Sequence, residues 1–157
     1  MRKVMWILLL SMYTFSVFSQ ASTQSANKNN TKKTESRTYY DSNGNKQGLA
    51  RVDNDTKTYY DKNGNRTGVA KEDSNGNKTY FDRNGNRQAT TRVSNGTESH
   101  YDKNGQRTGT TKVDANGNQT HYDKNGQRTG TTKVDSNGNQ THYDKNGRKT
   151  GVTKVYK

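Results

Sequence analysis

Three histidines, His100, His121 and His142, are the residues of this chain whose side chains are best suited to acid–base chemistry or metal binding. They recur every 21 residues, and the equivalent earlier positions are Tyr39, Tyr59 and Tyr80. On strands two apart, such histidines are separated by ~9.6 Å, too far for neighbouring rings to share one metal ion. The chain has no cysteine, and no nucleophile is paired with a base. We therefore expect structural histidines, no enzyme, no cofactor and no small-molecule substrate.

A second pattern, Asp-x-Asn-Gly-Asn at 73–77, 114–118 and 135–139, is partly similar to a calcium loop. In the calcium loop, however, glycine comes later and a glutamate ligand follows at the twelfth position. Both features are missing here, and ordinary turn chemistry accounts for these residues. We expect no metal site.

Aromatic rings and cations form the remaining functional pattern. An aromatic residue precedes aspartate in every repeat, at Tyr40, Tyr60, Phe81, Tyr101, Tyr122 and Tyr143. A cation follows that aspartate in five of them, at Lys62, Arg83, Lys103, Lys124 and Lys145. Net charge is +13, and rings interleaved with cations suit polyanions such as anionic glycans, lipopolysaccharide, teichoic acid or extracellular nucleic acid. These eleven residues are our candidate ligand-binding face; alternatively, the lysines only keep edge strands soluble.

The element that positions these residues is a tandem repeat. The aromatic-Asp dipeptide recurs at spacings of 20, 21, 20, 21 and 21 residues. Each unit has two turn sequences, mostly containing Asn-Gly, between short segments rich in Thr, Val and Tyr, which predicts two antiparallel strands per unit. Residues 38–157 therefore hold six tandem β-hairpin repeats of 20 to 21 residues.

Turn geometry sets the expected register. A two-residue type I′ turn at Asn63-Gly64 would place Asp61 opposite Arg66 and an aromatic or histidine ring opposite Gly or Ala in each repeat. In the other turn, a three-residue loop with Gly117 in the left-handed conformation alternates with a two-residue turn at 95–96, which preserves the register. The aromatic column then shares a face with a cation row: Arg51, Lys71, Arg92, Lys112, Lys133 and Lys154.

The fold expected from these features is all-β. Hydrophobic residues make up only 24% of the chain, too few for a compact two-layer core. We predict a single-layer, twisted antiparallel meander or open spiral.

The N-terminus has the features of an export signal. Arg2 and Lys3 precede an apolar run over 4–18 and a small-x-small site at 19–21. We predict a signal peptide at 1–21, a disordered polar linker at 22–37 and no stable membrane span after cleavage. The mature protein is expected to be secreted, periplasmic or at the cell surface.

Exported protein should begin near Ser22 or Gln20, because the small residues at 19–21 fit the cleavage site. Intact-mass measurement of the exported material checks this. A species retaining Met1 in the inner membrane would contradict the prediction.

Segments such as VDANGNQTHYDKNGQR (113–128) resemble the YD repeats of bacterial Rhs-type and animal teneurin-type surface proteins. The shared order is a GN-x-T segment, the YD dipeptide and two glycine turns, over roughly 38–157. The resemblance implies β-hairpin spirals in an extracellular setting, with carbohydrate contact. This chain departs from the pattern in its shorter units and lack of proline.

The leading functional hypothesis is a bacterial binding or adhesive module for anionic carbohydrate or another polyanion. Two alternatives remain open. The repeats could self-associate into a matrix or fibre through exposed terminal strands, or the chain could be an accessory fragment of a YD-repeat toxin system.

Overall fold

The computed structural model describes residues 34–157, which form twelve antiparallel strands. Their bounds are β1 (Thr34–Asp41), β2 (Lys46–Asp53), β3 (Thr56–Asp61), β4 (Arg66–Glu72), β5 (Lys78–Asp82), β6 (Arg87–Ser94), β7 (Thr97–Asp102), β8 (Arg107–Val113), β9 (Gln119–Asp123), β10 (Arg128–Val134), β11 (Gln140–Asp144) and β12 (Lys149–Tyr156). The described part contains no helix long and apolar enough to cross a membrane. The all-β repeat prediction is confirmed.

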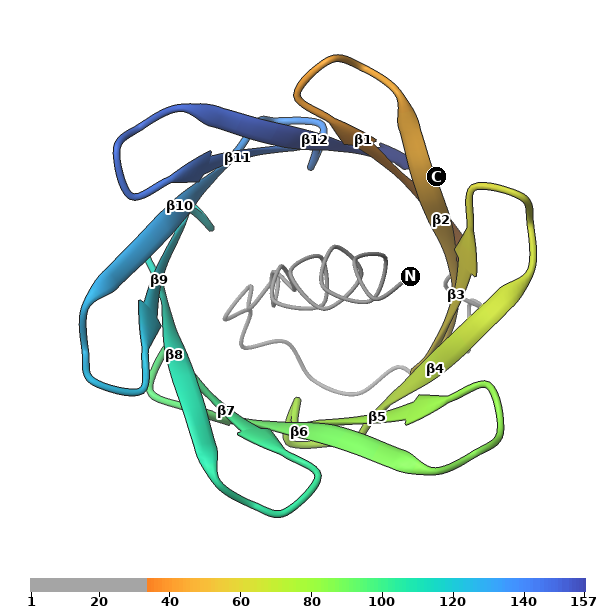
Figure 1. The fold of residues 1–157 in the computed structure, drawn as a ribbon, viewed down its shortest axis with the longest axis horizontal. Helices are drawn as coiled ribbons and strands as arrows, with labels where there is room; N and C mark the ends of the chain where they lie inside the picture. Colours follow the sequence, from red (N-terminus) through yellow and green to blue (C-terminus); the bar gives the residue numbers. More distant parts are fainter. Residues whose placement is uncertain (1–33) are drawn as a thin grey trace, which may run out of the picture.

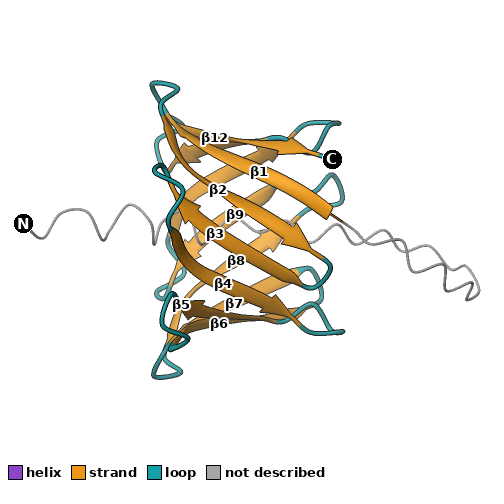
Figure 2. Cartoon of the chain, turned by 90° about the vertical axis from the view of Figure 1, so that its right-hand side faces the viewer, coloured by secondary structure: helices purple, strands orange, loops and turns teal. Residues whose placement is uncertain are grey.

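The sheet closes on itself, so the predicted open meander or spiral is wrong. Each strand pairs with its sequence neighbours, and β1 also pairs with β12 through six residue partners from Ser36↔Tyr156 to Asp41↔Gly151. Figure 1 shows the resulting ring, with β1 beside β12. Figure 2 shows strands inclined to the barrel axis and turns at both ends. Closure gives hydrogen-bond partners to the backbone groups of two strands that an open sheet leaves unpaired.

The first strand begins before the predicted start of the repeats. Residues 34–37 of the expected disordered linker belong instead to β1: all four pair with β2, and Ser36 and Arg37 also pair with β12. The predicted signal peptide and the rest of the linker, 22–33, lie outside the described residues.

The turn that follows each aromatic-Asp dipeptide differs from the predicted type I′ turn. At 61–65 only Gly64 has a positive φ (86°), and its N–H donates to the Asp61 carbonyl at 3.1 Å. This is a type I turn with a glycine bulge. The bulge pairs Tyr60, rather than Asp61, with Arg66. The predicted Asp–cation cross-strand pairs are therefore wrong.

The physical reason lies in the aspartate side chain. Oδ1 of Asp61 accepts the backbone N–H groups of Asn63 and Asn65, both at 2.9 Å. The carboxylate thus satisfies the donors of a type I turn, which the choice of Asn-Gly alone did not reveal. Equivalent bonds recur in the turns that begin at Asp41, Asp82, Asp102, Asp123 and Asp144.

The turns at the opposite end follow the prediction. Gly117 has a φ of 81° in a three-residue loop, whereas Asn95 and Gly96 both have positive φ in a two-residue turn. The register on either side is preserved, as Thr90↔Tyr101 and Thr110↔Tyr122 show. Turn type therefore compensates for the alternating repeat length.

Glycines opposite large rings make close strand contact possible. The predicted pairs are confirmed throughout: Tyr39↔Gly48, Tyr59↔Gly68, Tyr80↔Ala89, His100↔Gly109, His121↔Gly130 and His142↔Gly151. A Cβ added at Gly109 would lie 2.3 Å from the Tyr122 carbonyl oxygen on the next strand. A larger side chain there requires backbone movement.

The inner face carries a ring of side chains, one from each strand, which we call the interior ring. In strand order it consists of Tyr39, Ala50, Tyr59, Ala70, Tyr80, Thr91, His100, Thr111, His121, Thr132, His142 and Thr153. Its first half is the apolar core around Tyr59 and Tyr80, and its second half is polar. The sequence predicted that histidines and tyrosines would share a face, but not that this face would become an interior.

Candidate functional site

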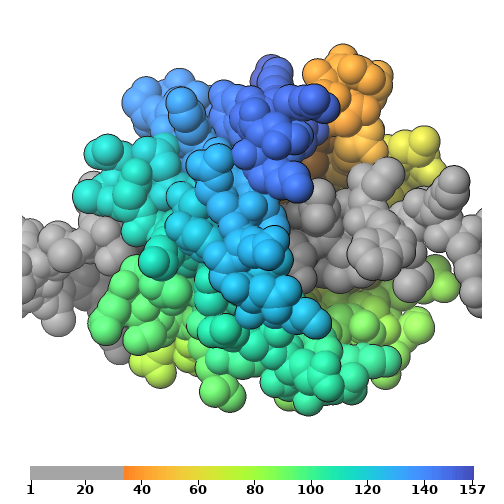
Figure 3. Space-filling view, turned by 60° about the vertical axis from the view of Figure 1, so that its left-hand side comes forward, coloured from red at the N-terminus to blue at the C-terminus, as the bar shows by residue number. Residues whose placement is uncertain are grey.

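The outer face of the barrel carries six pairs of one cation and one aromatic ring, which we call the outer belt. Cation-to-centroid distances range from 5.2 Å (Arg92 to Tyr101) to 5.9 Å (Lys71 to Phe81). The pairs are Arg51–Tyr60, Lys71–Phe81, Arg92–Tyr101, Lys112–Tyr122, Lys133–Tyr143 and Lys154–Tyr40. All six cations are exposed and all six rings are half-buried. Figure 3 shows the successive repeats side by side on the outer surface.

Register explains why each cation reaches a ring. Phe81 on β5 is directly opposite Val69 on β4, and Lys71 is two residues further along β4. Residues in this diagonal relation face the same side of the sheet, within reach of long side chains. The same diagonal arrangement crosses the seam, where Tyr40 pairs with Val152 and Lys154 lies over the Tyr40 ring at 5.7 Å. Closure therefore makes the outer belt continuous.

The five predicted cations after the aspartates lie at one end of the barrel and are exposed; we call them the rim cations. They are Lys62, Arg83, Lys103, Lys124 and Lys145. Within residues 34–157 no ion pair involves any of them.

Arginines of the preceding repeat hold this rim together. Nη2 of Arg66 donates to the Arg83 carbonyl at 3.0 Å, and Nη2 of Arg128 donates to the Lys145 carbonyl at 3.1 Å. Equivalent bonds join Arg87 to Lys103 and Arg107 to Lys124. Because these bonds use main-chain carbonyls, they order the turns without neutralising the rim cations.

The turn aspartates are engaged within their own turns. The backbone N–H and side-chain amide of Asn45 hold the pKa of Asp41 below its ordinary value, and Asn65 does the same for Asp61. At the other end, Asn118 lowers the pKa of Asp114 in the same way. The carboxylates that suggested a calcium loop therefore serve as turn acceptors. Within residues 34–157 no cluster of three or more His, Asp or Glu side chains could hold a metal ion.

All eleven candidate residues face outward or lie on one rim, but the structure groups them in two sets. The six aromatic residues pair with a cation row that sequence reasoning placed on their face but did not include in the site. The missed residues are Arg51, Lys71, Arg92, Lys112, Lys133 and Lys154. The signal was present in the register, since a cation diagonal to an aromatic ring recurs in every unit.

Charged side chains are also buried inside the barrel, on the inner faces of β5 and β7. Lys78 Nζ lies 3.2 Å from Oε1 of Glu98, and both residues are buried. Burial raises the pKa of Glu98, whereas Lys78 opposes that rise. Burial also lowers the pKa of Lys57 well below its ordinary value. Lys78 Nζ also lies 4.0 Å from Oε2 of Glu72, which is partly exposed, so removal of Lys78 costs the buried Glu98 carboxylate the partner that opposes its desolvation.

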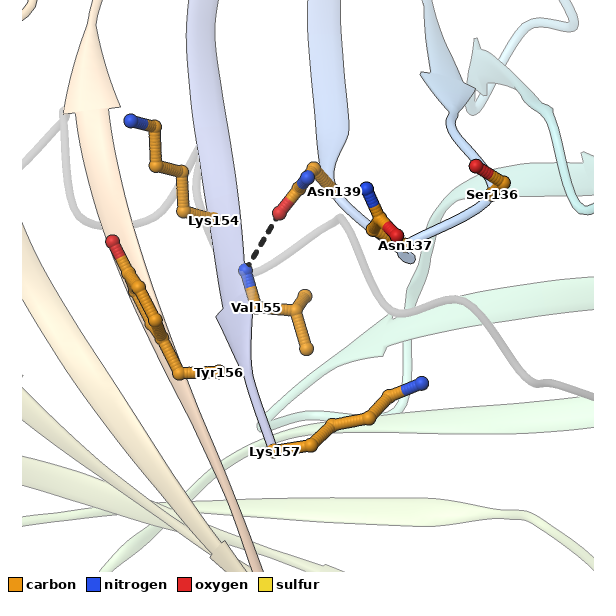
Figure 4. Close-up of a pocket in the computed structure, with 7 residues that line it drawn as sticks. All are labelled: Ser136, Asn137, Asn139, Lys154, Val155, Tyr156 and Lys157. Atoms are coloured by element: carbon orange, nitrogen blue, oxygen red, sulfur yellow. Dashed lines mark hydrogen bonds between the residues drawn. The ribbon is translucent and has the colours of Figure 1, made fainter.

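The end of the barrel opposite the rim cations has an open, polar depression of about 530 Å³ (Figure 4). Its lining is Ser136, Asn137, Asn139, Lys154, Val155, Tyr156 and Lys157. Oδ1 of Asn139 accepts the Val155 N–H at 3.0 Å, which joins adjacent repeats across its floor. Lys154 also belongs to the outer belt, so the depression extends that surface.

Comparisons with known proteins do not assign the chain to a family. No protein-family model matches it, and no curated protein matches it. Among solved structures it is similar to alternansucrase in complex with isomaltononaose, at 24% sequence identity and a TM-score of 0.21. That match covers 70% of this chain, which spans 10% of the alternansucrase chain. Such a TM-score carries no conclusion about fold or function.

Proposed function

We propose that the protein is an exported, non-catalytic binding or adhesive module for anionic glycan or other polyanionic surfaces. The observation that carries this proposal is the outer belt, six exposed cations each held over an aromatic ring around the barrel. The rim cations add a second row of exposed positive charge at one end.

Pre-organisation is the physical advantage of this arrangement. A cation held over a ring gains about 0.5–1 kcal/mol at an exposed site and loses conformational freedom before a ligand arrives. Binding then costs less side-chain entropy than it does with free lysines. Each anionic group that the protein neutralises also releases counterions, so affinity falls as salt rises.

Closure bears on the self-association alternative. Pairing of β1 with β12 occupies the two edges that terminal-strand association requires. Within the described strands, that route to a fibre therefore requires opening of the barrel. Polyanion binding needs no such change. The resemblance to YD repeats is a hypothesis about ancestry. The accessory role in a YD-repeat toxin system is the other functional hypothesis, and we favour polyanion binding over it.

Replacing Lys62, Lys103, Lys124 and Lys145 together by glutamine should weaken retention on heparin and flatten its dependence on salt, because fewer counterions are released. A plot of log affinity against log salt gives both quantities. The fold should survive, since these side chains make no ion pair within residues 34–157.

Arginine at the same four positions is the matched control and should restore the parent's dependence of affinity on salt. Parent protein that binds neither heparin, anionic glycans nor DNA at low salt contradicts the proposed function.

Changing Tyr101 and Tyr122 to serine should lower affinity at every salt concentration with little change in slope, since stacking releases few ions. Loss of the ring also frees Arg92 and Lys112, which the two rings hold at 5.2 and 5.6 Å. Binding isotherms and a thermal melt of the same samples separate lost affinity from lost fold.

Phenylalanine at both positions is the control, because Phe81 fills the equivalent place in the third repeat. Phenylalanine variants as weak as the serine variants would show that the ring itself does not support binding.

A further inference from the structure

Seven of the twelve side chains of the interior ring form one unbroken hydrogen-bonded chain. His100 Nδ1 lies 3.0 Å from Thr91 Oγ1, and His100 Nε2 lies 2.9 Å from Thr111 Oγ1. The next two histidines repeat both contacts at 3.0 and 2.9 Å. The histidine–threonine chain is therefore Thr91, His100, Thr111, His121, Thr132, His142 and Thr153, joined by six hydrogen bonds. Its threonines are at most 3% exposed.

The sequence contains two versions of this ring, and they differ in matched pairs. Tyr39 and Tyr59 are followed eleven residues later by Ala50 and Ala70. Each of the three histidines is followed, at the same distance, by threonine. Each imidazole is opposite a glycine, which leaves room for the ring to reach the threonine on the next strand. The third repeat combines Tyr80 with Thr91, which begins the hydrogen-bonded chain, so five of the six repeats follow one version or the other.

The number of hydroxyl and imidazole hydrogens determines how many protons the histidine–threonine chain can bind. Four hydroxyls and three neutral imidazoles supply seven hydrogens for six links. Thr111 and Thr132 each lie between two histidine nitrogens, so only a threonine at an end of the chain can direct the single spare hydrogen to a group outside it. Thr91 provides that end, since its side chain also hydrogen bonds to Tyr80. If Thr91 donates to Tyr80, all three histidines carry their proton on Nδ1, and each remaining threonine donates to the Nε2 atom of the histidine before it.

One added proton is compatible with this chain and a second is not. A histidinium donates from both nitrogens, and the hydroxyls on either side of it can turn outward so that all six links remain. The two spare hydrogens then lie at the two ends. With two histidinium rings, a threonine between them accepts twice, and its own buried hydrogen has no acceptor within the chain. We propose that the histidine–threonine chain is a proton-binding site that takes up one proton, shared among its three imidazoles.

The charged surroundings bias where that proton lies. Lys78 on β5 opposes charge on His100, while Glu98, beside His100 on β7, is held by Lys78. Gln119 and Gln140 are the uncharged equivalents of Glu98 beside the other two histidines. Beyond Thr153 across the seam, β1 contributes Tyr39 and the Arg37–Glu35 pair. The shared proton should therefore favour the His142 end of the chain.

Burial also makes the site resist protonation, since it lowers the pKa of each histidine to about 4. The shared proton is therefore acquired only in acid.

Imidazole ¹⁵N and ¹³C NMR of the full chain tests the proposal. At neutral pH all three rings should show the same Nδ1–H tautomer. On acidification in sucrose, which favours the compact state so that amide signals remain those of the fold, the three rings should shift with one midpoint and a combined uptake of one proton. The change should be largest at His142 and smallest at His100. Mixed tautomers, or two or three rings each titrating completely within the folded state, would overturn it.

The control variant His121→Tyr with Thr132→Ala copies the tyrosine–alanine version already present in the first two repeats. It cuts the chain at its middle, and Tyr80, between Ala70 and Thr91, shows that the ring accommodates a tyrosine with one alanine and one threonine neighbour. His100 and His142 should then titrate independently, with different midpoints. A common midpoint in this variant would equally overturn the shared site, and its thermal melt at neutral pH shows whether the barrel is intact.

Discussion

Replacing Gly109 by valine should cost the barrel at least about 3 kcal/mol of unfolding free energy, the upper end of the range for overpacking. Even the first carbon of the new side chain would lie 2.3 Å from the Tyr122 carbonyl oxygen. The two further methyl groups would enter the space opposite His100, where the imidazole reaches Thr111. Since small domains are stable by only about 5–15 kcal/mol, denaturant unfolding should show a large loss.

Three controls make this prediction specific. Thr108→Val adds the same residue on the outer face and should be nearly neutral. Gly109→Ala should be milder than valine, because Ala89 occupies the equivalent position in the third repeat. Equal effects of Thr108→Val and Gly109→Val would contradict the close strand contact.

The turn glycines should matter less than this strand glycine. Gly126 has a φ of 81° but nothing within 4 Å of an added Cβ. Valine there should therefore cost only the backbone strain of a left-handed residue, on the order of 1–2 kcal/mol. Ala115→Ser should be nearly silent because Ser74 and Ser136 occupy the equivalent turn positions. The same unfolding measurements order the three variants, and a Gly126→Val loss as large as that of Gly109→Val would contradict this ranking.

The local part of the fold could be predicted because it depends on short-range chemistry. Alternation placed the outer-belt cations on the face of the aromatic rings, and glycine spacing gave the pairs opposite His100, His121 and His142. The turn around Gly117 followed from the extra residue in its loop. Each of these depends on residues within one repeat or its neighbour.

Closure could not be predicted from the same patterns. Whether β1 meets β12 depends on twist and inclination accumulated over all twelve strands, and no single repeat encodes their sum. The low apolar content suggested a thin open sheet, yet the interior uses polar pairs such as His100–Thr91 and Lys78–Glu98. The role of Asp61 was missed for a similar reason. Its spacing from Arg66 suggested a cross-strand ion pair, whereas its carboxylate accepts backbone N–H groups of its own turn.

Acid should unfold the barrel, and the three histidines should supply most of the effect. Burial lowers the pKa of each from 6.5 to about 4 in the folded state, so the unfolded chain binds more protons between those values. A base with a lowered folded pKa contributes stability above pH 6.5, which is lost as pH falls toward 4. The expected loss is roughly 3 kcal/mol for each histidine, comparable in total with the stability of a small domain.

Urea unfolding at several pH values from 7.5 to 4 measures how the free energy of unfolding depends on pH. Replacement of histidine–threonine pairs shows which residues cause that dependence. His121→Tyr with Thr132→Ala should remove about a third of the pH dependence, because one of three titrating rings is lost while the turn aspartates are unchanged. Extending the exchange to His100→Tyr with Thr111→Ala and His142→Tyr with Thr153→Ala should leave only the contributions of the carboxylates and of buried Lys57. Identical slopes in parent and variants would contradict the prediction. A graded fall, one step for each pair removed, would locate the acid sensitivity in the half of the barrel from β6 to β12.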